Sequence, residues 1–543
     1  MKFNILTLSS LLFLCAFANA QQHTNVVKTV ADDRGTLDHF GHAISISGDF
    51  LIVGAYNEDD DENGNVPMEE AGSIYFFEND LSGNWNQQQK MVASDRSIDD
   101  RFGWSVAIDG DWAASGAVLE DHNESGLLYQ KDAGSVYLYK RDAAGHWIQE
   151  QKIVAADRQS GDYFGSTLSM FGHYLAVGAH LEDDDVNGNN ALAQAGAVYI
   201  FKKDNQDVWN EIAKVLPNDR GVGDEFGIAV SLNNNRLVVG AHAEDHNVSG
   251  SVQRKNAGAV YVFTRDLNDN WIQEQKLVAS DRSPYDAFGY AVDIYDDKLI
   301  VGAFEEDEDV LGGNTQSGAG SAYTFERNAQ NVWTETQKLI GTDRTPNDHF
   351  GFSVAIEHNH CVVGAYQEDF DANGLFLKGD AGAAFVFKQD ASNNWNMIEK
   401  IVAFDRDTFD NFGYAVDING TNVLVGAEKE DEDINASNSL ANSGSVYVFE
   451  YPSFVGIHEN LSTNNINIYP SPFNEVLFIN TVDNFGEIDL KVFNLLGEVV
   501  YQNRYFNNNK IELNLKDLHA GIYILQLNSA GATLNTRVIK SNH

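Results

Sequence analysis

The sequence of 543 residues predicts an all-β protein, a seven-bladed β-propeller followed by a small C-terminal β-sandwich. A Phe-Gly pair recurs at a strict interval of 62 residues, from Phe40 to Phe102 and onward, and a Gly-Ala pair follows each copy in step. A period this regular indicates one repeated supersecondary unit. The repeats begin at Phe40, Phe102, Phe164, Phe226, Phe288, Phe350 and Phe412.

Each repeat divides into four segments whose β-branched and aromatic residues favour strands, with Gly, Asp and Asn between them. The first segment follows Phe-Gly, as in FGHAISI, and the second ends in Gly-Ala, as in FLIVGA. The third reads AGSIYFF or a close variant, and the fourth starts at a Trp, as in WNQQQKMVAS. Four strands in each of seven units predict propeller blades rather than a helical solenoid.

The two ends of the array predict how the propeller closes. Six repeats contain the fourth segment, whereas the seventh stops after SGSVYVFEY. Residues 25–34, NVVKTVADDR, match the missing segment and precede the first Phe-Gly. We therefore expect the N-terminal strand to complete the last blade, which removes the exposed edges of an open array.

The N-terminus and the composition predict an exported protein. Residues 1–20 combine a basic residue, an apolar stretch and a small-residue ending, which is typical of a signal peptide cleaved near Ala20. We assign residues 21–454 to the propeller and residues 455–543 to a linker and a second domain. No later apolar run is long enough to form a transmembrane segment. After cleavage Cys361 is the single cysteine, which excludes intrachain disulfides.

The formal net charge of −44 restricts the partners of the chain. A protein this acidic repels nucleic acid and anionic lipid, because it cannot neutralise their phosphates. We therefore expect no nucleic-acid partner, and we expect the surface to attract cations.

Two parts of the sequence resemble known families. The Phe-Gly, Gly-Ala and AG-x-x-Y-x-F series resembles the FG-GAP repeats of integrin α-chain propellers, in particular their bacterial branch, over about residues 22–452. This resemblance implies binding, adhesion or scaffold roles. Residues 458–543 resemble the C-terminal sorting domain of type IX secretion cargo, which implies that the outer-membrane secretion machinery is a partner; a generic adhesive β-sandwich is the alternative. The matching positions are Tyr469, Pro470, Pro472, Gly497, Leu518, Gly521, Tyr523 and Lys540.

An acidic loop that opens with Glu-Asp separates the second and third segments of every repeat. Many of these loops follow D-x-[DN]-x-[NS]-G, and alternating oxygen-bearing side chains suit Ca²⁺, which takes six to eight oxygen ligands. The twelfth loop position is acidic in repeats one, two and six, so those loops offer the fullest ligand sets. Integrin propellers place their calcium loop between the first and second strands, so the prediction rests on loop chemistry alone, and Asx-rich turns without metal are the alternative. The candidate ligands are Asp59, Asp61, Asn63, Glu70, Asp121, Asn123, Ser125, Asp132, Asp183, Asp185, Asn187, Asp245, Asn247, Ser249, Asp307, Asp309, Asp369, Asp371, Asn373, Asp380, Asp431, Asp433 and Asn435.

A second acidic element, D-R-x-x-x-D-x-F-G, joins each repeat to the next. We interpret it as a clasp between blades, in which Asp caps N–H groups of a turn and Arg pairs with carboxylates. The strand order places this element and the Glu-Asp loops at the same side of the disc.

The sequence predicts no enzyme, because it contains no H-E-x-x-H, no G-x-S-x-G and no phosphate-binding loop. We expect a secreted or cell-surface binding and adhesion module, stabilised by Ca²⁺, with an unidentified protein or glycan ligand. The alternative is a polysaccharide hydrolase with a site over the central channel, since paired carboxylates are abundant. An enzyme should show one asymmetric pocket with converging carboxylates of perturbed pKa, whereas a binding module should show near-equivalent loops.

Overall fold

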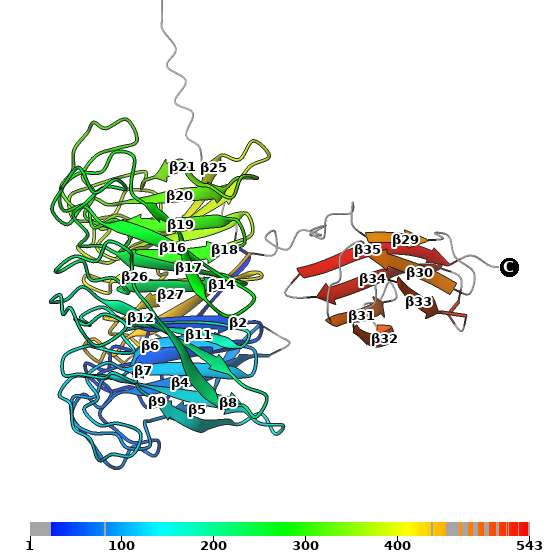
Figure 1. Cartoon of the computed structure of the whole chain (residues 1–543), viewed down its shortest axis with the longest axis horizontal. Helices are drawn as coiled ribbons and strands as arrows, with labels where there is room; N and C mark the ends of the chain where they lie inside the picture. The colour runs from blue at the N-terminus through cyan, green and yellow to red at the C-terminus, as the bar shows by residue number, and fades with distance from the viewer. Residues whose placement is uncertain are drawn as a thin grey trace, which may run out of the picture. The chain divides into compact units, whose positions relative to one another are not determined.

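The chain forms two compact units, Met1–Pro452 and Ser453–His543 (Figure 1). The computed structural model describes residues 23–80, 83–435, 438–451, 466–469, 476–481, 487–493, 499–506, 510–516, 518–519, 521–529 and 532–540. The predicted signal peptide lies outside the described residues, as do Pro470, Pro472 and Gly497. In the described part of the chain, no helix is long and apolar enough to cross a membrane.

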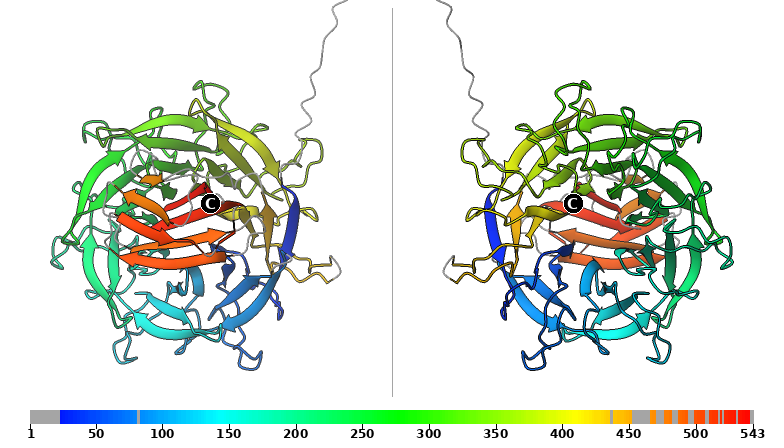
Figure 2. Two further views of the ribbon diagram at one scale, coloured as in Figure 1. Left: turned by 90° about the vertical axis from the view of Figure 1, so that its right-hand side faces the viewer. Right: turned by 90° about the vertical axis from the view of Figure 1, so that its left-hand side faces the viewer.

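The larger unit consists of seven antiparallel sheets of four strands, which we number 1 to 7 in chain order. Figure 2 shows them arranged around a common axis. Sheets 1 to 3 contain β2 (Ala43–Ser47), β3 (Phe50–Ala55), β4 (Ser73–Asn79) and β5 (Trp85–Met91); β6 (Phe102–Asp109), β7 (Trp112–Ala117), β8 (Ser135–Arg141) and β9 (Trp147–Ile153); β10 (Thr167–Phe171), β11 (Tyr174–Ala179), β12 (Ala197–Lys203) and β13 (Trp209–Val215). Sheets 4 to 6 contain β14 (Ala229–Asn233), β15 (Arg236–Ala241), β16 (Ala259–Arg265) and β17 (Trp271–Leu277); β18 (Ala291–Tyr295), β19 (Lys298–Ala303), β20 (Ser321–Arg327) and β21 (Trp333–Leu339); β22 (Ser353–Glu357), β23 (His360–Ala365), β24 (Ala383–Gln389) and β25 (Trp395–Ile401).

Sheet 7 combines strands from the two ends of the unit. It contains β26 (Phe412–Asn419), β27 (Asn422–Ala427) and β28 (Ser445–Glu450), and its fourth strand is β1 (Asn25–Thr29). The register of β1 on β28 runs from Asn25 opposite Glu450 to Thr29 opposite Val446. The N-terminal strand thus occupies the place that the fourth segment has in the other six sheets.

The burial of each strand follows its place in the sheet. The second and third strands are almost fully buried, as in FLIVGA of β3 and SIYFF of β4. The fourth strand alternates, and in β13 Trp209 is buried while Asn210 is exposed. Such alternation is expected of a strand with one face on the core and one in solvent.

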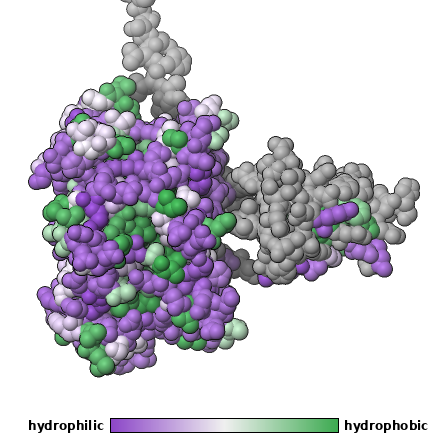
Figure 3. Space-filling view, in the orientation of Figure 1, coloured by the Kyte–Doolittle hydropathy of each residue, from purple (hydrophilic) through white to green (hydrophobic). Residues whose placement is uncertain are grey.

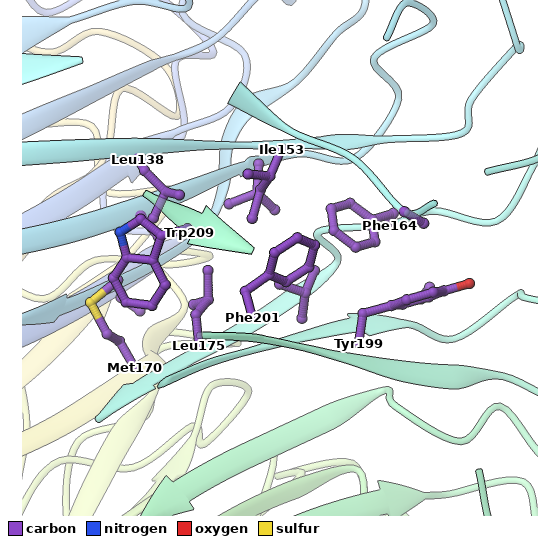
Figure 4. Close-up of a cluster of buried hydrophobic side chains, with 14 of the residues drawn as sticks. Leu138, Ile153, Phe164, Met170, Leu175, Tyr199, Phe201 and Trp209 are labelled. Atoms are coloured by element: carbon purple, nitrogen blue, oxygen red, sulfur yellow. The ribbon is translucent and has the colours of Figure 1, made fainter. Parts of the chain in front are cut away.

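The apolar core lies between neighbouring sheets, because residues of both contribute to the same cluster. Leu138 and Ile153 of sheet 2 pack with Leu175, Phe201 and Trp209 of sheet 3 (Figure 4). The Phe of the Phe-Gly pair belongs to this core. Phe164 is fully buried, with its ring centroid 5.4 Å from that of Tyr199 and 5.9 Å from that of Phe201.

The two conserved dipeptides of the repeat meet across the boundary between sheets. A Cβ atom on Gly54, of the first Gly-Ala, would lie 1.9 Å from the carbonyl oxygen of Gly103, of the next Phe-Gly. Gly103 also has φ +92, a conformation that side chains disfavour. The backbones therefore approach too closely for any other residue. The same contact joins Gly426 of sheet 7 to the carbonyl oxygen of Gly41, which precedes sheet 1.

The smaller unit has two sheets that bury one apolar cluster. Leu477 and Ile511 of the first sheet pack with Leu490 and Leu525 of the second. The first sheet has the order β29 (Ile466–Tyr469), β30 (Val476–Thr481), β33 (Lys510–Asn514), and the second has the order β32 (Val499–Phe506), β31 (Glu487–Phe493), β34 (Gly521–Ser529), β35 (Ala532–Lys540).

Candidate functional site

The first loop position, predicted to bind Ca²⁺, accepts a backbone hydrogen bond in every sheet. Asp59 Oδ1 accepts the N–H of Glu70 at 2.8 Å, so the side chain at position one is bonded to the main chain at position twelve. The residue at position twelve has a positive φ, +50° for Glu70, +51° for Asn256 and +60° for Gly318. Asn, Asp and Gly tolerate this conformation best. Backbone conformation therefore accounts for Asp, Asn or Gly at position twelve in five sheets without a metal, but not for Glu70 or Gln194. The equivalent bonds join Asp121 to Asp132, Asp183 to Gln194, Asp245 to Asn256, Asp307 to Gly318, Asp369 to Asp380 and Asp431 to Asn442.

The third loop position forms the kind of turn that Asp and Asn side chains stabilise. Asp61 Oδ1 accepts the N–H groups of Asn63 and Asn65, both at 2.9 Å. These bonds lower the pKa of Asp61, because they favour the ionised carboxylate. Asp142, in the hairpin between β8 and β9, makes the same turn without the calcium-type pattern. The other residues at position three, which accept equivalent bonds, are Asn123, Asp185, Asn247, Asp309, Asp371 and Asp433.

The predicted ligands have oxygen atoms of the type Ca²⁺ prefers, but their hydrogen bonds alone explain the loop conformation. The bonds use Oδ1 of Asp59 and Asp61, which leaves Oδ2 of each for an ion. Among the described residues, one group of three carboxylates has oxygen atoms within 4.8 Å of one another. It consists of Asp286, Glu306 and Glu308, none of which the sequence assigned as a ligand.

The Glu of each Glu-Asp pair lies in a buried network. In sheet 3, Glu182 is 1% exposed. The hydroxyl oxygen of Tyr199 lies 3.0 Å from Glu182 Oε2 and 2.8 Å from Asp157 Oδ1, within hydrogen-bond distance of both. The ammonium of Lys214 lies 2.7 Å from Asp157 and 3.1 Å from Glu182. Two carboxylates are thus bridged by one cation and one hydroxyl.

This network, which we call the framework network, recurs in all seven sheets. The N-terminal strand supplies the lysine of sheet 7, since Lys28 lies 2.8 Å from Asp405 and 3.3 Å from Glu430. Sheet 6 has Phe385 in place of the tyrosine. The remaining lysine–glutamate pairs are Lys90–Glu58, Lys152–Glu120, Lys276–Glu244, Lys338–Glu306 and Lys400–Glu368.

The second Asp of D-R-x-x-x-D adds a carboxyl to each framework network. Asp162 Oδ2 accepts the N–H of Gln159 at 2.6 Å, which confirms the predicted capping of the turn. Burial raises the pKa of Asp162 to about 8, and the nearby Glu182 carboxylate adds to the effect. The two acids therefore share a proton at neutral pH. The equivalent residues have pKa values raised to about 8 (Asp38, Asp100 and Asp286) or about 7 (Asp224, Asp348 and Asp410) for the same first cause.

The predicted pairing of the Arg with carboxylates is wrong. Arg96 donates to the carbonyl oxygens of Asp59 at 2.5 Å and Val66 at 2.8 Å, and Arg158 donates to that of Glu120 at 3.0 Å. The neighbouring carboxylates are already bridged by lysine. Each Arg therefore holds the backbone of the Glu-Asp loop of the preceding sheet, and this contact places the two acidic elements at the same end of the sheets.

A pocket of about 390 Å³, which we call the axial pocket, is lined by the first strands of all seven sheets. None of the described residues that line it is Asp, Glu, Lys or Arg. Among the lining positions, the residue after each Phe-Gly differs most between the seven sheets. It is His42, Trp104, Ser166, Ile228, Tyr290, Phe352 or Tyr414. A ring of aliphatic residues continues the lining inward: Ile44, Val106, Leu168, Val230, Val292, Val354 and Val416.

Five of the variable residues form a continuous arc of rings. The centroids of consecutive rings, from Trp104 through His42, Tyr414 and Phe352 to Tyr290, are 4.8, 5.0, 4.9 and 5.0 Å apart. All five side chains are half-buried. The repeat alignment marks this position as variable, but its convergence on one pocket depends on how the sheets are arranged.

An ion pair outside the pocket lining holds His42, the second ring of the arc. Glu428 Oε2 lies 2.8 Å from His42 Nδ1 and 3.7 Å from His39 Nδ1. Burial alone would raise the pKa of Glu428, but the two imidazoles outweigh it and lower the pKa to about 2. The Glu428 carboxylate is thus ionised and fixes the ring of His42.

A second, smaller cavity of about 180 Å³ lies beyond the aliphatic ring and contains two acids. Asp293 accepts the N–H of Ile356 at 2.7 Å, and Asp417 accepts that of Ile46 at 2.9 Å. Burial raises the pKa of Asp293 to about 6 and that of Asp417 to about 7. Both carboxyl groups thus tie their strand to the next sheet.

Comparison with known proteins identifies two families. The family model described as FG-GAP repeat matches residues 23–77, 85–139, 147–201, 209–263, 271–325, 333–387 and 395–449. The model described as secretion system C-terminal sorting domain matches residues 467–541. No curated protein sequence matches the chain. Each FG-GAP match begins at or just before the fourth strand of one sheet and ends in the third strand of the next, so every sequence repeat spans two sheets.

Proposed function

We propose that the chain, which belongs to the FG-GAP repeat family, is an extracellular binding and adhesion module. Its secretion sorting domain implies a secreted or cell-surface location and contact with the secretion machinery. The ligand site is the axial pocket and the surface around it. The protein is not an enzyme in this proposal.

A closed seven-bladed propeller is part of the proposal. It is supported by the pairing of β1 with β28 and by the contact of Gly426 with Gly41, which repeats between sheets 7 and 1 the contact seen between sheets 1 and 2. The shared core of the two C-terminal sheets supports a small β-sandwich as the sorting domain.

One observation carries the assignment of the binding site. The framework networks are nearly identical in seven copies, whereas the residue after Phe-Gly differs in almost every copy and lines one pocket. A residue that differs between otherwise equivalent units is free of the structural requirement that those units share. Variation gathered at one concave site is what a ligand-specific site requires.

The residues that line the axial pocket and the inner cavity favour binding over polysaccharide hydrolysis. Hydrolysis by the common mechanism needs two carboxyl groups that flank the scissile bond. The lining of the axial pocket offers none in the described part of the chain, and Asp293 and Asp417 in the inner cavity accept backbone hydrogen bonds.

The binding site is tested with the full secreted chain. Trp104→Ser copies the residue that sheet 3 has at the same place, Ser166, and therefore suits the framework. We expect the labelled variant to lose binding to the surface of the secreting cells. Phe376→Ala removes an aromatic side chain that is 71% exposed on a Glu-Asp loop and serves as control. Equal binding by both variants and the unchanged chain would place the site elsewhere.

We also propose that Ca²⁺ stabilises the Glu-Asp loops, chiefly those of sheets 1, 2 and 6, where position twelve is Glu70, Asp132 or Asp380. An ion that binds the native state alone raises stability by mass action. The midpoint of thermal unfolding should therefore rise with Ca²⁺ and fall with a chelator. An unchanged midpoint would leave hydrogen-bonded Asx turns as the full account of these loops.

A further inference from the structure

We propose that the axial pocket binds a neutral sugar ring of an extracellular glycan, stacked on the arc from Trp104 to Tyr290. This inference rests on the proposed function and names the ligand class of the same site.

The uncharged lining is the first argument, because it contrasts with the rest of the molecule. The chain has a net charge of −44, and hydrophilic residues cover most of the visible face of the larger unit (Figure 3). The described lining of the axial pocket has no carboxylate, ammonium or guanidinium group. The charge of Glu428 lies behind His42 and is bound by it. Apart from the imidazole of His42, which is already paired with Glu428, a charged ligand would find no partner charge in the lining, whereas a neutral ligand needs none.

The asymmetry of the pocket is the second argument. Sheets 5, 6, 7, 1 and 2 contribute the rings, whereas sheets 3 and 4 contribute the small Ser166 and the aliphatic Ile228. The pocket is therefore a half-circle of aromatic rings opposite a side with more room. The electron-rich faces of such rings attract the polarised C–H groups of a sugar ring.

The roomier side offers the polar groups that sugar hydroxyls need. Nδ1 of His180 lies 3.0 Å from Oγ of Ser166, and both residues line the pocket. Burial lowers the pKa of His180 to about 4, so its imidazole is neutral at physiological pH. The Ser166 hydroxyl donates to the carbonyl oxygen of Gly178 at 3.3 Å and so accepts from Nδ1–H of His180, which leaves Nε2 of His180 and a lone pair of Ser166 to accept hydrogen bonds from sugar hydroxyls. Opposite the aromatic arc, they match the polar edge of a pyranose, whose C–H face meets the rings.

The size of the pocket fits a small ligand. Its volume of about 390 Å³ is near the lower end of the range of roughly 300–1,000 Å³ for small-molecule sites. The aliphatic ring, which includes Ile44 and Val230, lines both the pocket and the inner cavity and so marks the boundary between them. One terminal sugar residue, rather than the middle of a long chain, is therefore the expected occupant.

The experiment titrates the full secreted chain by calorimetry with soluble oligosaccharides. The neutral probes end in a hexose, a 6-deoxyhexose or an N-acetylhexosamine; matched probes carry a uronate or a sulfate, and tetramethylammonium serves as a cationic probe. We expect at least one neutral probe to bind, and its acidic counterpart and the cation to bind at least tenfold more weakly. Absence of neutral binding, or stronger binding of a charged probe, overturns the proposal.

Variants taken from the repeat itself separate the pocket from the rest of the surface. Trp104→Ser and Phe352→Ile copy Ser166 and Ile228 at the same position of other sheets, and each should weaken sugar binding about tenfold or more, whereas Phe376→Ala should not. Unaltered affinity in the first two variants overturns the proposal. If no sugar binds but Trp104→Ser still abolishes attachment to cells, this inference fails and the proposed function stands. If the pocket variants attach normally, both fail.

Discussion

The framework network and the axial pocket are built from the same seven repeats but obey opposite rules. In the network, a lysine such as Lys214 bridges two acids in every sheet, and one tyrosine in seven is replaced. In the pocket, equivalent positions hold groups as different as Trp104 and Ser166. A buried charge tolerates no change because each group needs its partner, whereas a half-exposed position at the axis can vary. The residues of the framework network are therefore nearly the same in every repeat, whereas the residues that line the axial pocket can differ and form a ligand site.

The strongest test of the network is the dependence of stability on pH, because seven groups titrate together. The pKa of Asp162 and its six equivalents is raised to between about 7 and about 8, so the native state holds protons that the unfolded chain releases. The stability from each group is fully present below its unfolded pKa of 3.8, is lost as pH rises from there to the folded value, by at most about 1.4 kcal/mol per pH unit for each group, and does not fall further above that value. We expect the free energy of unfolding, measured with a chelator, to fall between about pH 6.5 and pH 8 and to level off above that.

Asp162→Asn provides the control for the pH series, because it removes one titrating group and can still accept the N–H of Gln159. Its pH dependence should be shallower than that of the unchanged chain. His180 and His242, whose pKa values burial lowers to about 4, affect stability below this window, since their usual value is 6.5. A stability that is constant or increases across the window would show that the acids do not share protons.

Removal of one network cation should have the next largest effect. Lys214→Met leaves Glu182 and Asp157 without their bridge, and an uncompensated buried charge costs about 3–5 kcal/mol. Lys131→Met is the matched control, because its side chain is 70% exposed beside Asp132 and surface pairs contribute about 0–1 kcal/mol. Chemical denaturation measures both. Similar losses in the two variants would contradict a structural role for the network.

The tyrosine of the network should contribute less. Tyr199→Phe removes one hydroxyl that lies within hydrogen-bond distance of Glu182 and Asp157, at a cost of about 1–3 kcal/mol. The lower end is expected, because sheet 6 has Phe385 at this place and Lys400 still bridges its acids. Phe385→Tyr, the reverse change, should be neutral or stabilising in the same denaturation assay. A large loss in Phe385→Tyr would show that the sheets are not equivalent here.

The strands were predictable from sequence, whereas the framework network and the convergence of the axial pocket were not. The predicted segments match the sheets closely, since β3 ends at Ala55 of Gly-Ala and β5 begins at Trp85. Lys90, Asp33 and Tyr75 stand far apart in the chain and meet only in the folded sheet. The Tyr recurs in the third segment and the Lys in the fourth, as in AGSIYFF and WNQQQKMVAS, but the sequence could not distinguish this recurrence from that of residues required for strand packing.

The acidic loops show the limit of reading chemistry from spacing. The pattern of Asp59 and Asp61 suits calcium and equally suits turns closed by N–H···O bonds. The sequence predicts metal ligation at the twelfth position from its oxygen-bearing side chains, whereas the structure shows that this residue has a positive φ. A positive φ in a turn and oxygen ligation of Ca²⁺ both favour Asp and Asn, so the residue types alone cannot distinguish a metal site from a turn without metal.

The most direct test of the whole account compares Trp104→Ser with Tyr199→Phe in one preparation of the full chain, by unfolding and by attachment to cells. We expect Trp104→Ser to abolish attachment and to lower the free energy of unfolding by less than the roughly 3–5 kcal/mol lost when a core Trp is truncated, because Trp104 is half-buried against His42 and Tyr56 but makes no framework contact. Tyr199→Phe should lower stability and leave attachment intact. If Trp104→Ser unfolds the protein, or if attachment survives it, the separation of framework from binding site is wrong.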